Sequence, residues 1–268
     1  MKITIIGAGN IGGAIACGLA KGNRFEASDI TCTAHSQETL DRIKEMNPGF
    51  VLSLDNVTAV QGADIIVIAV KPWRVKEVLD QIKGVLNYDR QIIVSVAAGI
   101  TFEELNNFLT QNTGFDDCLA TPTLFRIMPN TAIEVLSSMT FVAAFHATPE
   151  QSDLIVGIFK ELGNAMLVEE RLMGAGTALA SSGIAFALRY IRAAIEGGVE
   201  LGFYPKQAQE IVLHTVKGAV DLLLENKSNP ETEIDKVTTP GGITIKGLNE
   251  MELSGFTSSV IRGLKASK

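Results

Sequence analysis

The segment that decides the fold of this chain is Ile3-Thr4-Ile5-Ile6-Gly7-Ala8-Gly9-Asn10-Ile11-Gly12. Its β-branched residues 3–6 predict a buried strand, and a helical segment follows the glycines. Three glycines in the pattern Gly-x-Gly-x-x-Gly between a strand and a helix are typical of a dinucleotide-binding turn. Gly7 permits the tight turn, Gly9 lets a pyrophosphate approach the backbone, and Gly12 allows the helix to pack closely. A purely structural glycine-rich turn is the alternative.

Short apolar runs alternate with amphipathic segments up to about residue 165. Alternation of this kind predicts right-handed crossovers and an α/β fold, with a Rossmann-like, doubly wound and mostly parallel sheet. Two helix starts are indicated by Thr101 with Glu104, a capping box, and by Thr148-Pro149. The predicted strands are Ile3–Ile6, Ile30–Thr33, Ile65–Val70, Ile92–Val96, Leu124–Met128, Phe141–Phe145 and Ala165–Val168.

After about Glu169 the pattern becomes helical, with helices predicted over 172–202, 206–226 and 243–265. We therefore expect a cofactor-binding domain at 1–169 and an all-α dimerisation and substrate domain at 170–268. The apolar surface of these helices suggests that a partner subunit completes their core. Residues Leu172–Leu188 carry no formal charge, but this run is shorter than the ~20 apolar residues of a membrane span. It predicts a helix at an oligomer interface and no membrane partner.

Composition narrows the function classes further. The formal net charge of −7 argues against a general nucleic-acid binder. Cys17, Cys32 and Cys118 are far apart and outside any metal spacing, so we expect buried thiols, a reducing compartment and no metal site. Because the first strand begins at Lys2 or Ile3, a signal peptide is not expected and the cytoplasm is the predicted location.

The end of the second predicted strand bears on the choice of cofactor. NAD-binding sheets usually carry an acidic residue there, but this chain has Thr33-Ala34-His35-Ser36. His35 and Ser36 have groups that can donate hydrogen bonds to a 2′-phosphate, which favours NADPH over NADH. Ser36 as the cap of the next helix is an alternative compatible with that role.

Two further strand ends carry candidate cofactor residues. Ala69-Val70-Lys71-Pro72 follows a strand at the edge where ligands bind in such sheets. Lys71 is either a contact to cofactor phosphate or ribose, or a solvated loop charge. The small residues Ala97-Ala98-Gly99 after the next strand leave space for a flat ring.

Near the other end of the chain, Thr239-Pro240-Gly241-Gly242-Ile243-Thr244 places two glycines before a predicted helix. A helix start leaves up to four backbone N–H groups without intrahelical partners, which is a cradle for a carboxylate. Thr244 adds a hydroxyl beside them. The segment predicts a site for a small anionic substrate.

Taken together, these motifs resemble the pyrroline-5-carboxylate reductase family along nearly the whole chain. The markers are Gly7–Gly12, Ala69–Pro72, Ala97–Gly99, Arg126–Thr131 and Thr239–Thr244. The resemblance implies that Asn56 lies near the adenosine ribose, Asn130 near the nicotinamide and Ser181 near the substrate. It also implies a helical C-terminal domain that interlocks with a second subunit, giving a homodimer at least and often a decamer.

The resemblance further implies reduction of 1-pyrroline-5-carboxylate to L-proline, the last step of proline biosynthesis, with NADPH and with NADH as the alternative donor. The imine carbon accepts hydride while the ring nitrogen keeps or gains a proton. Thr244 is the expected catalytic hydroxyl at that nitrogen, and assistance of this kind is worth roughly 10²–10⁴-fold. Thr239, Gly241 and Gly242 are expected to hold the substrate carboxylate.

The chain departs from the family at the domain junction. Where the family has a segment of the type Ser-Gly-Ser-Gly-Pro-Ala-Tyr, this chain places Ile184 and Phe186 at the proline and tyrosine positions. A reductase of another cyclic imine carboxylate and a non-catalytic cofactor-binding relative therefore stay open. The β-hydroxyacid dehydrogenases are disfavoured, because no lysine occurs between Leu172 and Pro205 to act on a carbonyl oxygen.

Overall fold

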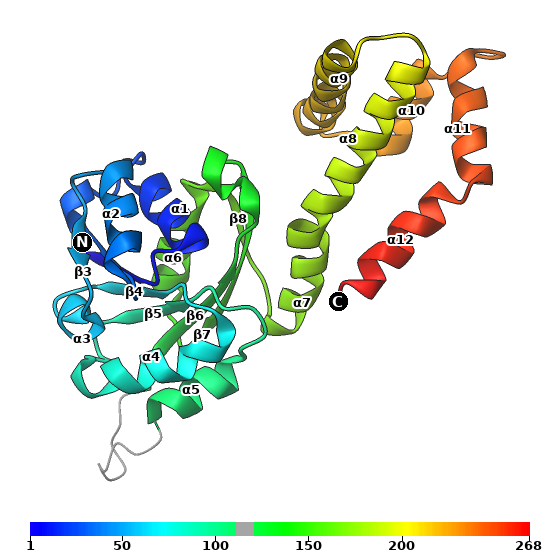
Figure 1. Cartoon of the computed structure of the whole chain (residues 1–268). Helices are drawn as coiled ribbons and strands as arrows, with labels where there is room; N and C mark the ends of the chain where they lie inside the picture. The colour runs from blue at the N-terminus through cyan, green and yellow to red at the C-terminus, as the bar shows by residue number, and fades with distance from the viewer. Residues whose placement is uncertain (111–120) are drawn as a thin grey trace. The chain divides into compact units, whose positions relative to one another are not determined.

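The computed structural model describes residues 1–110 and 121–268 (Figure 1). These residues form two compact units, Met1–Ser181 and Ser182–Lys268, and each is described by itself. Cys118 lies outside the described residues. The functional boundary predicted after Glu169 stays a prediction.

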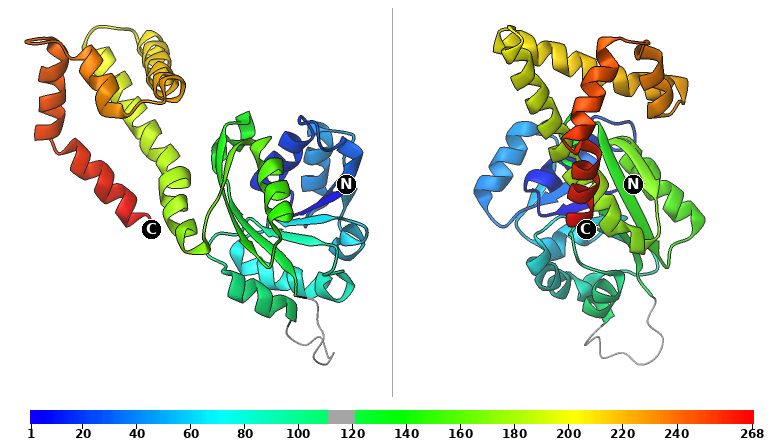
Figure 2. Two further views of the ribbon diagram at one scale, coloured as in Figure 1. Left: turned by 180° about the vertical axis from the view of Figure 1, so that it is seen from behind. Right: turned by 90° about the vertical axis from the view of Figure 1, so that its right-hand side faces the viewer.

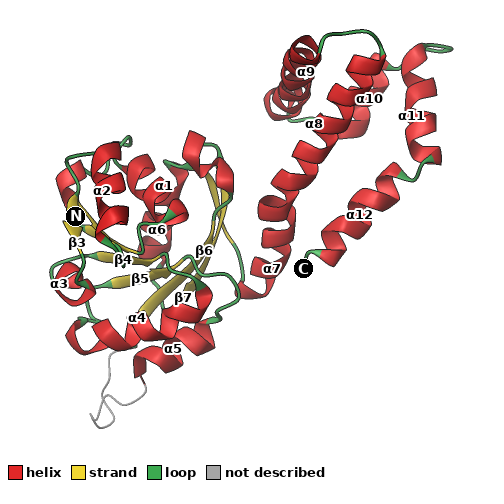
Figure 3. Ribbon diagram, viewed as in Figure 1, coloured by secondary structure: helices red, strands yellow, loops and turns green. Residues whose placement is uncertain are grey.

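An eight-stranded sheet with the order β3-β2-β1-β4-β5-β6-β7-β8 forms the centre of the first unit (Figure 3). Neighbouring strands are parallel, except that β6 and β7 are antiparallel. The Rossmann-like, doubly wound sheet predicted from the sequence is therefore confirmed. The strands are β1 (Ile3–Ile6), β2 (Ile30–Thr33), β3 (Val51–Ser53), β4 (Ile65–Ile68), β5 (Ile92–Ser95), β6 (Thr123–Met128), β7 (Ser138–Phe145) and β8 (Gly163–Leu167).

Helices cover both faces of this sheet (Figures 1 and 2). One face packs against α1 (Asn10–Leu19), α2 (Gln37–Met46) and α6 (Pro149–Lys160). The other packs against α3 (Asn56–Val60), α4 (Val75–Ile82) and α5 (Phe102–Thr110). Short 3₁₀ turns lie at η1 (Ala27–Asp29), η2 (Pro72–Arg74), η3 (Lys83–Val85), η4 (Thr131–Val135) and η5 (Glu170–Leu172).

Alternation along the central strands divides the core between the two faces. In β4, Ile65 and Val67 belong to the cluster beneath α1, whereas Ile66 and Ile68 belong to the cluster beneath α4. All four are essentially inaccessible to solvent. A strand that is buried on both faces needs an unbroken apolar run, which is why the sequence pattern identified these strands.

Both predicted helix starts in this unit are confirmed. The Thr101 amide donates to Glu104 Oε2 at 2.8 Å, and the Glu104 amide donates to Thr101 Oγ1 at 3.2 Å. Thr148 and Gln151 form the same reciprocal pair, with Pro149 at the first helical position. Because the Thr101 amide and hydroxyl donate to Glu104, the pKa of its carboxyl lies below its ordinary value.

The sheet differs from the sequence prediction in several details, and β7, for example, begins at Ser138 and not at Phe141. The short edge strand β3 was not predicted, because its first residue, Val51, is 47% exposed and only three residues pair. The strand predicted over Ile65–Val70 ends at Ile68, because the chain leaves the sheet there to form the loop before η2.

The second unit is entirely helical. It contains α8 (Gly183–Glu200), α9 (Pro205–Asn226), α10 (Pro230–Val237), α11 (Ile243–Leu253) and α12 (Phe256–Ala266). The predicted helix at 206–226 is confirmed as α9. The stretch predicted as one helix at 172–202 is helical, but it is divided into α7 (Met173–Gly176), the π-helical turn η6 (Thr177–Ser182) and α8. A single helix over 243–265 is wrong, because Gly255 adopts φ 79° and ends one helix before the next begins.

This unit, whose residues are all described, buries little of its apolar surface. Ala208 is its only fully buried hydrophobic residue, at the point where a Cβ on Gly198 would lie 3.1 Å from the Ala208 Cβ. Large apolar side chains stand exposed on every helix, among them Leu188, Val199, Leu213, Leu224, Val237, Leu253 and Ile261. A helical unit of this kind needs another surface against its apolar faces.

Among the described residues, one helical stretch, Glu170–Glu200, is long and apolar enough to cross a membrane by length and composition. Its most apolar window has a mean hydropathy of 1.2, and only 6% of that window is buried within the chain. An oligomer interface needs the same apolar exposure, so the helix is compatible with the interface predicted from the sequence.

We expect Val67→Ala to lower the free energy of unfolding by about 2 kcal/mol, because it removes buried methyl groups and leaves a cavity in β4. The matched control is Val135→Ala, since that side chain is 72% exposed. The control is expected to stay within about 0.5 kcal/mol of wild type. Urea unfolding followed by circular dichroism measures both, and equal losses would contradict the described core.

Candidate functional site

The turn between β1 and α1 admits no side chain at two of its glycines. Gly7 adopts φ 91°, and a Cβ there would lie 2.7 Å from Val70 Cγ1. A Cβ on Gly12 would lie 2.3 Å from the Gly7 carbonyl oxygen, which is a prohibitive contact. The Gly7 and Ala8 amides both donate to the Thr33 carbonyl, at 3.1 and 2.8 Å, and so fix the turn against β2.

Gly9 plays a different part in the same turn. A Cβ on Gly9 would meet no atom within 4 Å, so the space beside it is open. Gly9 is also the residue before α1, and no side chain caps this helix start. The amides of the first helical turn, Asn10 to Gly12, therefore face an open volume, as a pyrophosphate requires.

A cavity of about 540 Å³ lies at the carboxyl ends of β1, β2, β4 and β5. Ligands bind at this edge in open α/β sheets, at the point where the strand order reverses. The cavity brings together ten of the predicted cofactor residues: Gly7, Gly9, Asn10, Ile11, His35, Ala69, Val70, Lys71, Pro72 and Ala97. Its chemistry and size fit part of a dinucleotide.

Asn56 lines a neighbouring cavity of about 280 Å³. The Thr33 hydroxyl donates to Asn56 Oδ1 at 2.6 Å, and Asn56 Nδ2 donates to Gln81 Oε1 at 3.0 Å. The two cavities share five residues: Gly7, Ala34, His35, Val70 and Arg74. Asn56 is thus held at the β2 side of the edge, which is compatible with its expected place near a ribose.

Ser36 serves as a helix cap. Its Oγ accepts the Thr39 amide at 3.4 Å and forms a 3.0 Å hydrogen bond with the Thr39 hydroxyl. Its role toward a phosphate stays a prediction. His35 is exposed and lines both cavities, so its ring is available to a ligand.

Lys71 and Trp73 stand exposed in the loop after β4. Lys71 lines the larger cavity, and no ion pair involves it within the described part of the chain. Trp73, the single tryptophan of the sequence, is 78% exposed. The loop therefore presents a free ammonium group toward the cofactor edge, as the first of the two readings of Lys71 requires.

Asn130 and Ser181 contribute to a different contact. Asn130 Oδ1 accepts the Ala132 amide at 3.1 Å, and its Nδ2 donates to the Ala180 carbonyl at 3.4 Å. The Ser181 hydroxyl donates to the Pro129 carbonyl at 3.2 Å. These bonds tie the end of the first unit to the loop after β6. The nicotinamide and substrate roles of the two residues stay predictions.

Arg126, in the same marker motif, is a structural residue by its contacts. It is 7% exposed, and its Nη1 donates to Glu170 Oε1 at 2.7 Å. The same oxygen accepts the Phe102 amide at 2.7 Å. Arg126 is buried and the Glu170 side chain is 37% exposed, so the pair lies at the boundary of the core and joins the start of α5 to the segment leading to α7.

The described cysteines do not offer a thiolate. Burial, with a smaller contribution from the neighbouring Cys17, raises the pKa of Cys32 to about 12. Burial also raises the pKa of Cys17, although Lys21 partly opposes this. Within residues 1–110 and 121–268, no three His, Cys, Asp or Glu side chains cluster to hold a metal ion.

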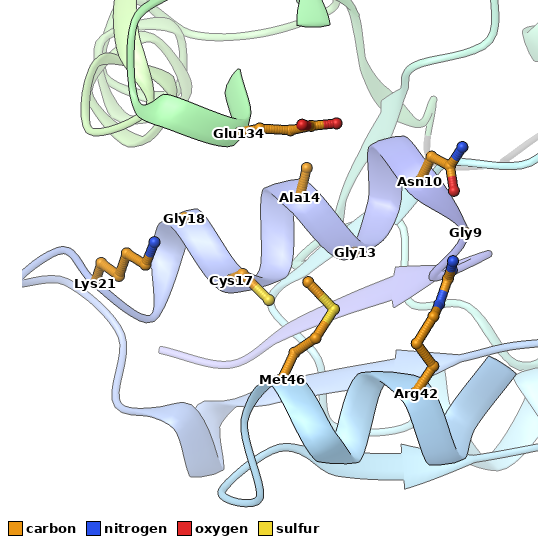
Figure 4. A pocket seen from close by; sticks show the side chains of 10 residues that line it. All are labelled: Gly9, Asn10, Gly13, Ala14, Cys17, Gly18, Lys21, Arg42, Met46 and Glu134. Atoms are coloured by element: carbon orange, nitrogen blue, oxygen red, sulfur yellow. The ribbon is translucent and has the colours of Figure 1, made fainter. Parts of the chain in front are cut away.

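A second groove, of about 370 Å³, follows the outer face of α1 and begins at the same glycine turn (Figure 4). Small residues of α1 form its floor, and Arg42 extends from α2 toward Gly9. Glu134 lies on the opposite side. Neither Arg42 nor Arg74 was predicted as a site residue, because only their tertiary positions bring them to the cofactor edge.

In the second unit, Thr239–Gly242 forms a tight turn. The Gly242 amide donates to the Thr239 carbonyl at 2.9 Å, and Gly241 adopts φ 72° after Pro240, as in a type II turn. A Cβ on Gly242 would lie 2.5 Å from Thr239 Oγ1. Both glycines are therefore needed for this conformation.

The turn leads directly into α11, whose start carries no side-chain cap. The Gly242 amide is bonded within the turn, whereas the amides of Ile243 and Thr244 begin the helix without intrahelical partners. The role of the glycine pair toward a substrate carboxylate stays a prediction. Thr244 is half-buried in the first turn of α11, and Thr239 is exposed.

Comparison with known proteins adds to this geometry. The family model described as pyrroline-5-carboxylate reductase dimerisation matches residues 170–268, and the one described as NADP oxidoreductase coenzyme F420-dependent matches residues 2–99. The chain is 38% identical over 277 residues to pyrroline-5-carboxylate reductase 1 of Dictyostelium discoideum, covering 99% of this chain and 48% of that protein. It therefore spans about half the length of that relative.

Two further known proteins match this chain over nearly the whole length of both sequences. The chain is 36% identical over 279 residues to pyrroline-5-carboxylate reductase 2 of the same organism, covering 99% of this chain and 90% of that protein. The solved structure of a pyrroline-5-carboxylate reductase from Coxiella burnetii superimposes with a TM-score of 0.89 at 28% identity, covering 99% of this chain and 95% of the other.

The glycine turn gives a prediction that separates binding from folding. Gly9→Ala is expected to raise the Kd for NADPH about tenfold or more, because a methyl group would occupy the space beside the helix start. That methyl group meets no protein atom, but the Gly9 backbone at φ −72° and ψ −147° lies outside the regions that L-residues favour, so a small loss of thermal stability is expected. Gly12→Ala, whose Cβ would collide with the Gly7 carbonyl oxygen, is expected to lose more stability as well as affinity.

Calorimetric titration with NADPH and thermal unfolding measure the two variants side by side. Wild-type affinity in Gly9→Ala would mean that the pyrophosphate binds elsewhere.

Proposed function

The chain belongs to the pyrroline-5-carboxylate reductase family, and we propose that it reduces 1-pyrroline-5-carboxylate to L-proline with NADPH. The observation that carries this proposal is the Thr239–Gly242 turn, which opens α11 with free amides beside the Thr244 hydroxyl. The open glycine turn at α1 supplies the second requirement, a cofactor edge.

The cofactor edge supports a nicotinamide dinucleotide. The first-turn amides of α1 would hold the pyrophosphate, and the cavity at the ends of β4 and β5 would receive the ribose and the ring. When bound, the reduced nicotinamide supplies the hydride. His35 in place of an acidic residue at the end of β2 supports NADPH, with NADH as the alternative donor.

The substrate is a cyclic imine that carries a carboxylate. We assign the carboxylate to the amides of Ile243 and Thr244, with the exposed Thr239 hydroxyl as a further donor. The glycines 241 and 242 act by shaping the turn that aims these groups.

At the reacting bond, C5 of the imine gains the hydride and the ring nitrogen carries the proton that becomes the amine hydrogen. The nitrogen must be protonated for C5 to be electrophilic. Thr244 is the group we assign to that nitrogen, where its hydroxyl orients the ring and relays the proton. Assistance of this kind is worth roughly 10²–10⁴-fold in rate.

A homodimer is part of the proposal. The dimerisation family model covers residues 170–268, and the helices of the second unit leave their apolar side chains exposed. A second subunit would cover those faces and complete a core that the unit lacks. Assembly beyond the dimer, including a decamer, and a cytoplasmic location belong to the same proposal.

The activity itself is tested by oxidation of NADPH at 340 nm with 1-pyrroline-5-carboxylate, with the six-membered cyclic imine acid as a parallel substrate. We expect turnover of the five-membered imine. Preference for the larger ring would change the substrate and keep the chemistry. NADPH binding without turnover of either would favour a non-catalytic relative, in which Ile184 and Phe186 at the junction are the altered residues.

Thr244→Ala is expected to lower kcat by roughly 10²–10⁴-fold, because it removes the hydroxyl at the ring nitrogen. The Kd for NADPH is expected to stay within about twofold of wild type, well under the 1.4 kcal/mol of a tenfold change. Thr215→Ala is the matched control, since the Thr215 hydroxyl donates to the Ile211 carbonyl within α9. Wild-type turnover in Thr244→Ala would remove this residue from the mechanism.

Because we assign much of the core of the helical unit to its partner, the unfolding midpoint is expected to rise with protein concentration. Light scattering should give a mass that is a multiple of the 28.6 kDa chain. A midpoint that is constant over a hundredfold dilution, together with a monomeric mass, would overturn the dimer.

A further inference from the structure

Arg74 lies where the two cavities of the cofactor edge meet. It lines both, together with His35. The larger cavity contains the open glycine turn, and the smaller contains Asn56. Arg74 and His35 are therefore the two basic side chains that line both cavities, and they reach the junction from opposite sides of β1.

The backbone around Arg74 is firmly held. Pro72 begins the η2 turn, which the Arg74 amide closes by donating to the Lys71 carbonyl at 2.9 Å. The next residue, Val75, is completely buried and begins α4. Because the chain cannot rotate here without exposing Val75, the base of the Arg74 side chain is fixed beside the cavities.

The guanidinium group also takes part in a chain of long hydrogen bonds at the surface. Arg74 donates from Nε and Nη2 to the two carboxylate oxygens of Glu77, both at 3.4 Å. Gln81 donates to Glu77 at 3.5 Å and accepts from Asn56, which in turn accepts from the Thr33 hydroxyl. The network occupies Glu77 and leaves Arg74 Nη1 for a ligand.

The chemistry of this junction points to a phosphate monoester. A 2′-phosphate carries a charge of about −1.5 to −2 at neutral pH and offers three acceptor oxygens. A planar guanidinium with free N–H groups is the side chain best matched to it. In dinucleotide-binding sheets, the 2′ position of the adenosine ribose lies at the end of β2, beside residues that correspond to His35.

We propose that Arg74, assisted by His35, binds the 2′-phosphate of NADP(H) and makes the chain select NADP(H) over NAD(H). This inference rests on the proposed function, because it assumes that a dinucleotide occupies the cavity. It adds the specificity residue that the strand-end pattern did not identify. Glu77 holds the guanidinium in place and does not contact the cofactor.

The opposite assignment is that Glu77 accepts a hydrogen bond from a free ribose 2′-hydroxyl, as acidic residues do in NAD-specific sheets. Glu77 lines the smaller cavity and its side chain is 54% exposed, so the test must include it. Its two oxygens already receive Arg74 and Gln81, which favours the role of an anchor.

The test compares Arg74→Ala with wild type by calorimetric titration of the full-length protein with NADPH, NADH, 2′,5′-adenosine bisphosphate and 5′-AMP. We expect Arg74→Ala to raise the Kd values for NADPH and for the bisphosphate about 10–100-fold. The Kd values for NADH and 5′-AMP are expected to stay within about twofold of wild type. Lys76→Ala is the matched control, since it removes a charge two residues away that is paired with Asp80.

Arg74→Lys keeps the positive charge but lacks the planar guanidinium group, and it is expected to recover part of the NADPH affinity. Thermal unfolding of each variant guards against misfolding. If folded Arg74→Ala loses affinity for all four ligands equally, or for none of them, the assignment is overturned. A Glu77→Gln variant that specifically loses affinity for NADH would also overturn it. Failure of the wild type to bind either dinucleotide would instead sink the proposed function.

Discussion

The close contact between the first strand and the first helix is the constraint on which the rest of the molecule depends. A Cβ on Gly12 would lie 2.3 Å from the Gly7 carbonyl oxygen, and a Cβ on Gly7 would lie 2.7 Å from Val70 Cγ1, so both positions must lack a side chain. That contact brings the amides of α1 to the edge of the sheet where β1, β2, β4 and β5 end. The open volume beside the first turn of α1 follows from this contact.

Sequence patterns predicted the elements that depend on local periodicity and turn chemistry. The central strands were identified because each is buried on both faces and must be continuously apolar. The short edge strand β3 and the break at Gly255 escaped, since Val51 is half-exposed and a single glycine within a helical pattern does not fix its own φ. Both failures concern residues whose conformation is decided by their neighbours in space.

The candidate site also has features that the sequence predicts and features that only the structure shows. Glycine spacing predicted the turn at 7–12, and ten of the predicted cofactor residues line one cavity. The Ser36 cap is a local contact with Thr39 and was one of the alternatives that the sequence offered. The hydrogen bonds of Asn56 to Thr33 and to Gln81, by contrast, join side chains from separate elements. Such contacts between separate elements have no signature in a single sequence. Arg74 was therefore recognised as a candidate only once the structure showed the packing of α3 and α4.

Trp73 gives the molecule an intrinsic fluorescent probe, so no added label is needed. It is the single indole in the sequence, it is 78% exposed, and it precedes Arg74 in the loop after β4. Indole emission overlaps the absorption of a reduced nicotinamide, so energy transfer from this one fluorophore reports occupancy of the neighbouring edge. Its spectrum, free of contributions from other indoles, also records any change of polarity in that loop.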